Sequence, residues 1–293
     1  MNQSLLSVAP YTHYIWYLLL LLQGLFIAAS FIPTLWTSEL LGYNELAHTT
    51  EGKALQKLLP VMLYPGLCLA TIITTYSFFN LKIMTLAFLG SSINTFLLVS
   101  IIKYQLDYVT TADTFTKVRK WFQRRRAPPT PDENTLNEYL NDNDMTIQIQ
   151  QYLFLKLPFE LYAGYNLAWN VSLLNLMIQK LTRSAILSEL LAYISLLFLL
   201  AAGCYVMWTE KKGLCYGVGA GLAWYLLGVF FQLVYLSFPI MYAYSDAAIS
   251  VTKYMTIIIA NLLVCTMALR VAKNIINVRR DDDFEFCSCC GRV

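Results

Sequence analysis

Long apolar stretches separated by short polar ones are the dominant pattern along this 293-residue chain. A helix that rises about 1.5 Å per residue needs roughly 20 apolar residues to cross about 30 Å of hydrocarbon. Seven stretches reach that length, too many for burial in one soluble core. The pattern predicts an all-α fold, namely a polytopic integral membrane protein with a seven-transmembrane-helix bundle. The predicted spans are Tyr14–Trp36, Leu58–Phe79, Ile83–Ile102, Phe159–Ile178, Ala185–Trp208, Leu214–Leu236 and Ala247–Leu269.

The spans and their connections divide the chain into four regions. Residues 1–102 contain the first three transmembrane helices, and residues 157–270 contain the last four. Residues 103–156 form a predicted cytoplasmic loop, in which a basic segment precedes an acidic linker that contains prolines. Residues 271–293 form a predicted cytoplasmic tail that contains cysteines. These connections leave no room for a second globular domain.

Basic residues predict which side of the membrane each connection faces. Positive charge near helix ends prefers the cytoplasm. With the N-terminus outside, 17 of the 21 lysines and arginines would lie on the cytoplasmic side. The reverse orientation would place Arg124–Arg126 and the pair Lys211 and Lys212 outside. We therefore predict an N-out, C-in topology.

The composition agrees with a bilayer as the main solvent. Charged residues make up 13% of the chain, against about 25% in soluble domains. A lipid-facing surface requires such a deficit, so the lipid bilayer is the first predicted partner. The net charge of +3 is too small to suggest nucleic-acid binding. We expect a multi-pass protein of the plasma membrane or an endomembrane.

The fourth span is the most polar one. Tyr162, Asn166, Trp169 and Asn170 share one face of a helix with 3.6 residues per turn. Amides and aromatic rings together can hold a small, largely apolar ligand. The same side chains also form hydrogen bonds between membrane helices, and both interpretations stay open. We interpret Glu160, at the cytoplasmic end of this span, as an interfacial charge.

The sixth span carries a stripe of glycines, which we call the glycine stripe. Gly213, Gly217 and Gly221 recur at four-residue spacing, and Gly228 lies on nearly the same face. Small residues at this spacing let two helix backbones approach closely, so we predict that the stripe packs against a neighbouring helix. A flexible helix is the alternative. A second membrane protein is another possible partner for the stripe.

Two further features invite chemical interpretation. Lys253 lies within the seventh span, and snorkelling of its ammonium to the outer interface explains it more simply than a retinal Schiff base. In the tail, Cys287, Cys289 and Cys290 are candidates for lipidation by palmitate, with free thiols as the alternative. Their spacing, with no histidine, matches a zinc site poorly. We expect no metal and no cofactor.

Catalytic signatures do not appear in the sequence. It contains no HExxH, no GxxxxGK[ST] and no GxSxG, the patterns expected of metalloproteases, P-loop enzymes and serine hydrolases. We therefore assign no catalytic residues and expect a protein that is not an enzyme.

Two segments resemble a known family. Residues 157–170, with the sequence LPFELYAGYNLAWN, resemble a helix of proteins related to the tryptophan-rich sensory protein and translocator family. Residues 221–229, GLAWYLLGV, are similar to a stretch of larger relatives. The resemblance implies binding of apolar ligands such as tetrapyrroles or sterols. This chain departs from the family at Tyr165, where tryptophan is common, and in having seven predicted spans instead of five.

These observations lead to three hypotheses of function. The first is binding or transport of a small, largely apolar ligand, with the fourth span as its polar lining. The second is a non-catalytic membrane interaction or scaffold subunit that uses the glycine stripe and the tail. The third is a seven-helix signalling receptor. A cavity beside Asn166 and Asn170 would favour the first hypothesis, and an exposed glycine stripe would favour the second.

Overall fold

A computed structural model describes residues 4–31, 65–73, 84–104, 151–182, 184–209 and 216–290. Residues 65–73 are helical, and helices form all the other elements of the described ranges. In chain order these are η1 (Pro10–His13), α1 (Tyr14–Phe31), α5 (Met84–Tyr104), the π-helical turn η3 (Gln151–Lys156), α8 (Leu157–Thr182), α9 (Ala185–Thr209), α10 (Tyr216–Val234), α11 (Phe238–Ala243) and α12 (Asp246–Cys290).

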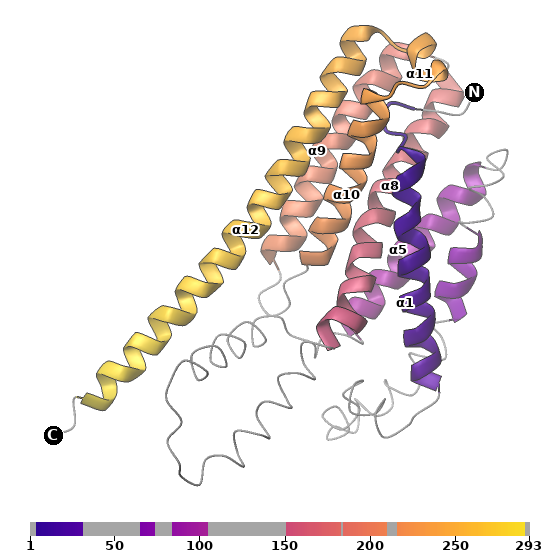
Figure 1. The fold of residues 1–293 in the computed structure, drawn as a ribbon. Helices are drawn as coiled ribbons and strands as arrows, with labels where there is room; N and C mark the ends of the chain where they lie inside the picture. The colour runs from indigo at the N-terminus through magenta and orange to yellow at the C-terminus, as the bar shows by residue number, and fades with distance from the viewer. Residues whose placement is uncertain are drawn as a thin grey trace.

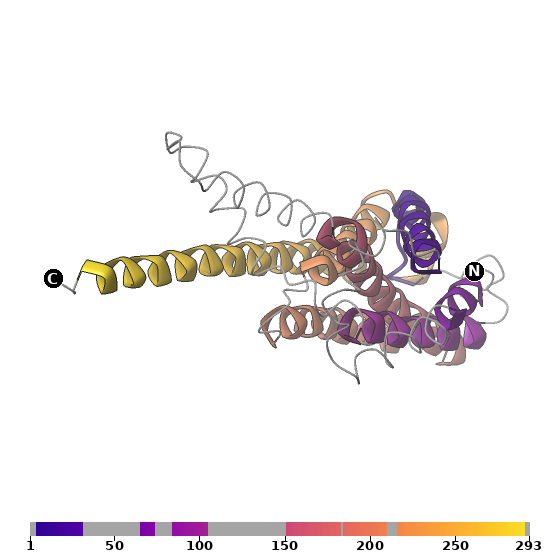
Figure 2. The same cartoon turned by 90° about the horizontal axis from the view of Figure 1, so that it is seen from below.

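The bundle is organised around α8. This helix contacts α5 and α10, and it also touches α1 and α9. α10 in turn packs against α9 and α12. The N-terminus and α11 lie at one end of the bundle, and α12 projects far beyond the other helices at the opposite end (Figure 1). The view from below shows the same projection of α12 (Figure 2).

Four helices within the described ranges are long and apolar enough to cross a membrane. They cover Met84–Ile102, Ala185–Trp208, Tyr216–Val234 and Asp246–Lys273. Large apolar side chains on their outer faces are exposed, for example Ile194, Leu197 and Phe198 of α9. Exposed apolar surface of this extent requires hydrocarbon rather than water as its solvent. The chain is an integral, multi-pass membrane protein, whereas the count of seven spans and the sidedness stay predictions.

The burial of α8 explains why its sequence is more polar than those of α5, α9 and α10. Phe159, Tyr162 and Tyr165 are at most 1% exposed, and Asn166 is fully buried. α8 lies between α5 and α10, so its side chains meet protein on two sides instead of lipid. Polar side chains in this position can bond to neighbouring helices, and membrane helices place their polar residues on such faces.

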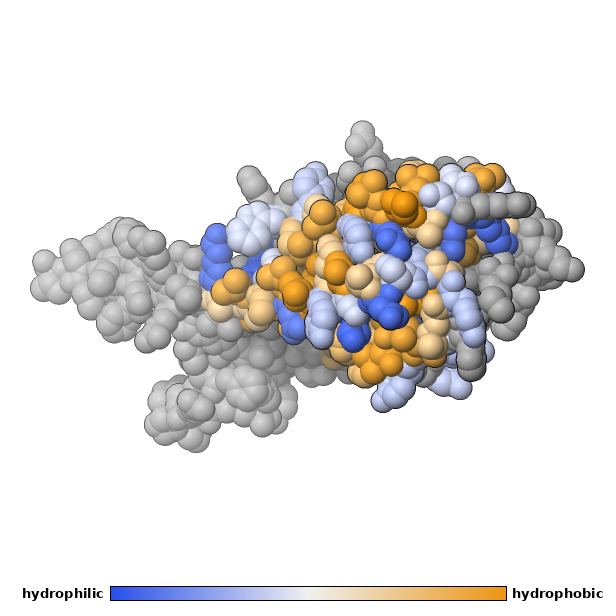
Figure 3. All heavy atoms as spheres, turned by 90° about the horizontal axis from the view of Figure 1, so that it is seen from above, coloured by the Kyte–Doolittle hydropathy of each residue, from blue (hydrophilic) through white to orange (hydrophobic). Residues whose placement is uncertain are grey.

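The turns at the α11 end contain local signals that start each helix. Ser184 precedes α9, and its side chain accepts a hydrogen bond from the N–H of Leu187 at 3.4 Å. Ser245 does the same for α12, accepting from the N–H of Ala248 at 3.2 Å. Serine before the first helical residue satisfies an otherwise unpaired N–H. Seen from above, this end shows hydrophilic and hydrophobic residues side by side (Figure 3).

Several predicted boundaries agree with the helices and one does not. α5 and α9 begin within one residue of their predicted spans, at Met84 and Ala185. α12 begins at Asp246 but continues to Cys290, past the end of the predicted span at Leu269. The predicted tail therefore lies largely within this helix up to Cys290. Most of the predicted loop, residues 105–150, lies outside the described residues, as does Gly213.

Candidate functional site

The polar face predicted from the sequence lies against α5. Tyr162, Asn166 and Asn170 follow one another at four-residue intervals on α8, so their side chains point to the same neighbour. Each of the three is buried. Their hydrogen bonds to side chains and backbone of α5 form a polar cluster, which we call the α5–α8 cluster.

Asn166 forms the centre of the α5–α8 cluster. Its Oδ1 accepts a hydrogen bond from the Ser91 hydroxyl at 2.9 Å. Its Nδ2 donates to the backbone oxygen of Ser91 and to the Thr95 hydroxyl, both at 2.9 Å. The amide of Asn166 therefore uses both donors and one acceptor site within the protein. This arrangement favours interhelical bonding as the role of Asn166.

Asn170, one turn later on α8, donates hydrogen bonds to the same two oxygens as Asn166. Its Nδ2 donates to the Ser91 backbone oxygen at 3.1 Å and to the Thr95 hydroxyl at 2.7 Å. Its Oδ1 is buried and, among the described residues, no donor bonds to it. The side chain as a whole is 8% exposed. A buried amide oxygen is a strong acceptor, so this atom offers a bonding position to a ligand.

Tyr162 joins a third segment to the α5–α8 cluster. Its hydroxyl accepts a hydrogen bond from Asn94 Nδ2 at 2.6 Å and lies 3.4 Å from the Thr71 hydroxyl. Thr71 belongs to the helical residues 65–73 and also donates to Asn94 Oδ1 at 3.4 Å. Trp169, the fourth predicted residue of this face, is buried with 9% exposure. The structure thus brings all four predicted ligand-binding residues onto the buried surface of α8.

The partners on α5 were not predicted as a site. Asn94 stands out in the sequence as an amide within a span, but Ser91 and Thr95 do not. Serine and threonine are common in membrane helices, because their hydroxyls can bond to the carbonyl one turn earlier. Thr95 does this as well, donating to the Ser91 backbone oxygen at 3.0 Å. Only the position of α8 shows that these hydroxyls also serve a neighbouring helix.

The glycine stripe faces α8 at Gly217 and Gly221. A Cβ at Gly221 would meet the backbone oxygen of Leu161, and one at Gly217 would lie 2.5 Å from Glu160 Cβ. On α8 itself, Gly164 faces the backbone of Val218 in the same way. Gly164 does not belong to a spaced pattern of glycines, so it was not predicted as a packing residue. Because α8 covers this part of the stripe, the stripe is not an exposed surface, and the expectation of a partner at Gly217 and Gly221 is not supported.

Glu160 is covered by protein. Its side chain is fully buried, and its interpretation as an interfacial charge stays a prediction. Its Oε2 accepts a hydrogen bond from the N–H of Gly217 at 3.0 Å, in the first turn of α10. The N-terminus of a helix carries partial positive charge, which stabilises a carboxylate there. Lys156, one turn earlier in the chain, is 1% exposed.

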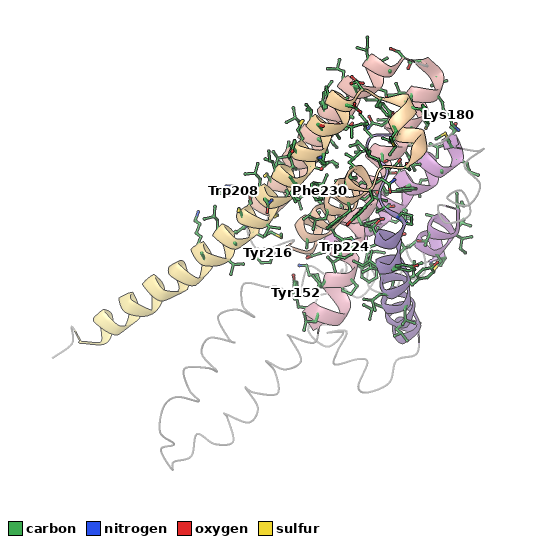
Figure 4. All side chains as sticks on the ribbon, turned by 45° about the horizontal axis from the view of Figure 1, so that its top comes forward. Tyr152, Lys180, Trp208, Tyr216, Trp224 and Phe230 are labelled. Carbon is green, nitrogen blue, oxygen red and sulfur yellow. The ribbon has the colours of Figure 1, made fainter. Side chains whose placement is uncertain are left out.

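The remaining predicted residues take no part in the α5–α8 cluster. Lys253 on α12 is half-buried, and its Nζ lies 5.2 Å from the centre of the Tyr254 ring. Trp208 of α9 lies beside α12 (Figure 4), with Nζ of Lys273 6.0 Å from its ring centre. The backbone of α12 includes Cys287, Cys289 and Cys290, whose side chains are not described. The described residues contain no cluster of three or more metal-ligating side chains.

Comparisons with known proteins do not add an identity. No protein-family model, characterised protein or solved structure matches this chain. The resemblance of residues 157–170 to the translocator-related family therefore stays a prediction, and function has to be argued from the geometry of the bundle.

Proposed function

We propose that this multi-pass membrane protein binds a small, largely apolar ligand next to the α5–α8 cluster. The observation that supports the proposal is the buried Oδ1 of Asn170, which no described donor satisfies. A buried polar atom without a partner costs free energy, about 1–3 kcal/mol for an acceptor of this kind. A ligand that donates one hydrogen bond to this atom would recover that cost.

The surroundings of Asn170 define the class of ligand. Trp169 and Leu173 are apolar, buried neighbours of Asn170 on α8. Small-molecule sites in proteins are mostly apolar, with a few polar groups that fix orientation. We therefore propose a ligand with an apolar body and a single hydroxyl or N–H donor. Sterols and tetrapyrroles, the ligands implied by the resemblance, both satisfy this description.

The proposal is tested by ligand binding to the purified full-length protein in detergent. Saturable binding of cholesterol and of protoporphyrin IX is measured by equilibrium titration for the wild type and for Asn170→Leu. We expect one of the two ligands to bind, and its affinity to fall about tenfold in the variant, the equivalent of about 1.4 kcal/mol for one hydrogen bond. Asn261→Leu is the control, because Asn261 is exposed on α12 and its Nδ2 donates to the backbone oxygen of Ile257 in the same helix.

Binding that is equal in Asn170→Leu and the wild type would refute the site. Failure of both ligands to bind saturably would refute the proposed ligand class. Thermal unfolding of each variant in the same detergent shows whether a loss of binding reflects a loss of fold.

α12 favours a second candidate function, that of a membrane interaction subunit. The helix continues for 17 residues beyond Lys273, the end of its candidate membrane span. A helix outside the bilayer offers a surface to a partner protein, and palmitoylation of Cys287, Cys289 and Cys290 would attach it to the membrane. The test is acyl labelling that hydroxylamine removes. The label should disappear when all three cysteines are replaced by serine, and a wild-type protein without label would contradict the acylation.

A further inference from the structure

The chain before α1 lies inside the bundle, which its sequence did not predict. We call residues 4–12 the N-terminal segment. Leu5, Leu6 and Thr12 are each 1% exposed, and Ser4 is 2% exposed. The segment is not regular helix between residues 4 and 9. An irregular backbone within a membrane protein is tolerated only where protein groups satisfy its N–H and C=O groups.

Side chains and backbone of two helices supply those groups. The backbone oxygen of Leu6 accepts hydrogen bonds from the Ser172 hydroxyl of α8 and the Tyr225 hydroxyl of α10, both at 3.1 Å. Three residues later, the N–H of Ala9 donates to the backbone oxygen of Gly228 at 3.1 Å. Two donors and one acceptor are thus arranged to hold one carbonyl and one N–H of a peptide. The helices thus bind the peptide backbone, while the Ser4 and Ser7 hydroxyls of the segment accept hydrogen bonds from its own N–H groups.

The shape of the site fits the segment as well. Gly228 faces Thr12, and a Cβ at residue 228 would collide with the Thr12 side chain. The ring of Tyr225 makes an edge-on contact with Tyr165, at 5.2 Å between ring centres. This contact fixes the direction in which the Tyr225 hydroxyl points. Trp224, labelled in Figure 4, reaches the Thr12 backbone oxygen with its Nε1 at 3.5 Å.

Much of the described surface of α1 faces away from the bundle, although Leu19 and Gln23 are buried. Five of its described large side chains are more than half exposed, namely Tyr14, Tyr17, Leu18, Leu21 and Leu25. The N-terminal segment ends where η1 leads directly into α1 (Figure 1). The position of the segment therefore fixes the outer end of α1 against the bundle.

We propose that Ser172, Tyr225 and Gly228 form a recognition site for an apolar peptide that contains a turn, and that the N-terminal segment, which turns between Ser4 and Ser7, is its occupant within the same chain. The site requires a carbonyl and, three residues later, an N–H, with leucine side chains at the buried positions. The segment acts as a latch that joins η1 to α10, and its release loosens the contact of α1 with α8. This site lies on a different face of α8 from the α5–α8 cluster, so the proposal stands apart from the proposed ligand site.

A full-length variant with a weakened latch tests the proposal. Leu5→Ser with Leu6→Ser keeps the backbone groups of the segment but removes its buried apolar side chains. We expect this double variant to have a lower melting temperature in detergent than the wild type. A synthetic peptide with the wild-type sequence of residues 1–12 should restore most of the loss in a saturable manner. The control peptide carries the same two serines and should give no increase.

The site itself provides the second measurement. Gly228→Leu in the double variant fills the position that Thr12 occupies, so the wild-type peptide should no longer raise the melting temperature. Leu6→Ala alone is the milder variant, to be used if the double variant cannot be purified in a folded state. The proposal is overturned if the wild-type peptide gives no shift, or if both peptides give the same shift. It is also overturned if rescue persists in the presence of Gly228→Leu.

Discussion

Replacing Gly221 by alanine should destabilise the bundle by forcing α8 and α10 apart. The added Cβ would lie 3.0 Å from the backbone nitrogen of Tyr165 and 3.1 Å from the backbone carbon of Leu161, whose oxygen is closer still. These atoms belong to the helix backbone, which cannot rotate out of the way as a flexible side chain does. The two helices must separate along the whole of their contact to accept a single methyl group.

The cost follows from two opposing effects. Overpacking a tight contact costs about 1–3 kcal/mol, and a collision with backbone belongs at the upper end, about 3 kcal/mol. Alanine also favours the helix over glycine by about 1 kcal/mol. The expected net loss for Gly221→Ala is therefore about 2 kcal/mol in the free energy of unfolding. This corresponds to roughly a 30-fold shift in the folding equilibrium, and leucine at the same position should cost more.

The matched control is Gly24→Ala on α1. A Cβ at Gly24 would have no atom within 4 Å, so only the gain in helix propensity should remain. Reversible unfolding in mixed detergent micelles, followed by circular dichroism, measures both variants in one assay. We expect them to differ by about 3 kcal/mol. Equal stability of Gly221→Ala and Gly24→Ala would refute the close packing of α8 on α10.

Three further predictions use the same unfolding assay. Asn166→Leu should lower the free energy of unfolding by about 2 kcal/mol, because it removes three interhelical hydrogen bonds of roughly 0.6 kcal/mol each and leaves their partners unsatisfied. The control Asn261→Leu should leave the free energy of unfolding unchanged. Equal effects of the two substitutions would argue against the α5–α8 cluster. Glu160→Gln keeps an acceptor for the Gly217 N–H, whereas Glu160→Leu removes it. The leucine variant should therefore be about 2 kcal/mol less stable than the glutamine variant. Equal stability of the two variants would show that the charge of Glu160, and not its hydrogen bond, is what stabilises the contact. Burial raises the pKa of Tyr244 above 10, so the stability contributed by its neutral hydroxyl should be constant up to pH 10 and should fall above it. Melting temperatures between pH 8 and 11 would show this fall in the wild type and a smaller one in Tyr244→Phe.

The sequence was sufficient for those features that depend on hydrocarbon as solvent. Length and apolar content located α5, α9 and the start of α12, because a membrane helix must satisfy its backbone within itself over a fixed thickness. The polar face of α8 was also evident, because Tyr162, Asn166 and Asn170 recur with the helical period. Their periodicity shows which side of α8 avoids lipid.

The sequence was insufficient where a residue acts through a neighbour distant in the chain. Ser91 and Thr95 are ordinary residues of a membrane helix until α8 places Asn166 beside them. Gly164 gains its importance from Val218 of α10. The N-terminal segment escaped prediction because its apolar residues, such as Leu5 and Leu6, form too short a run for a span. The contact of Glu160 with the first turn of α10 was not predicted either, because Gly217 lies 57 residues away in the chain.

The length of α12 has a mechanical consequence for the cysteines at its end. A straight helix of 45 residues is about 67 Å long, more than twice the roughly 30 Å of hydrocarbon that a helix must cross. An upright α12 would carry Cys290 roughly 25 Å past Lys273. A fatty acid contributes binding energy only when its chain enters the hydrocarbon. An upright helix and an inserted acyl group at Cys290 therefore exclude one another. Acylation would require the distal half of α12 to bend until it lies along the bilayer surface.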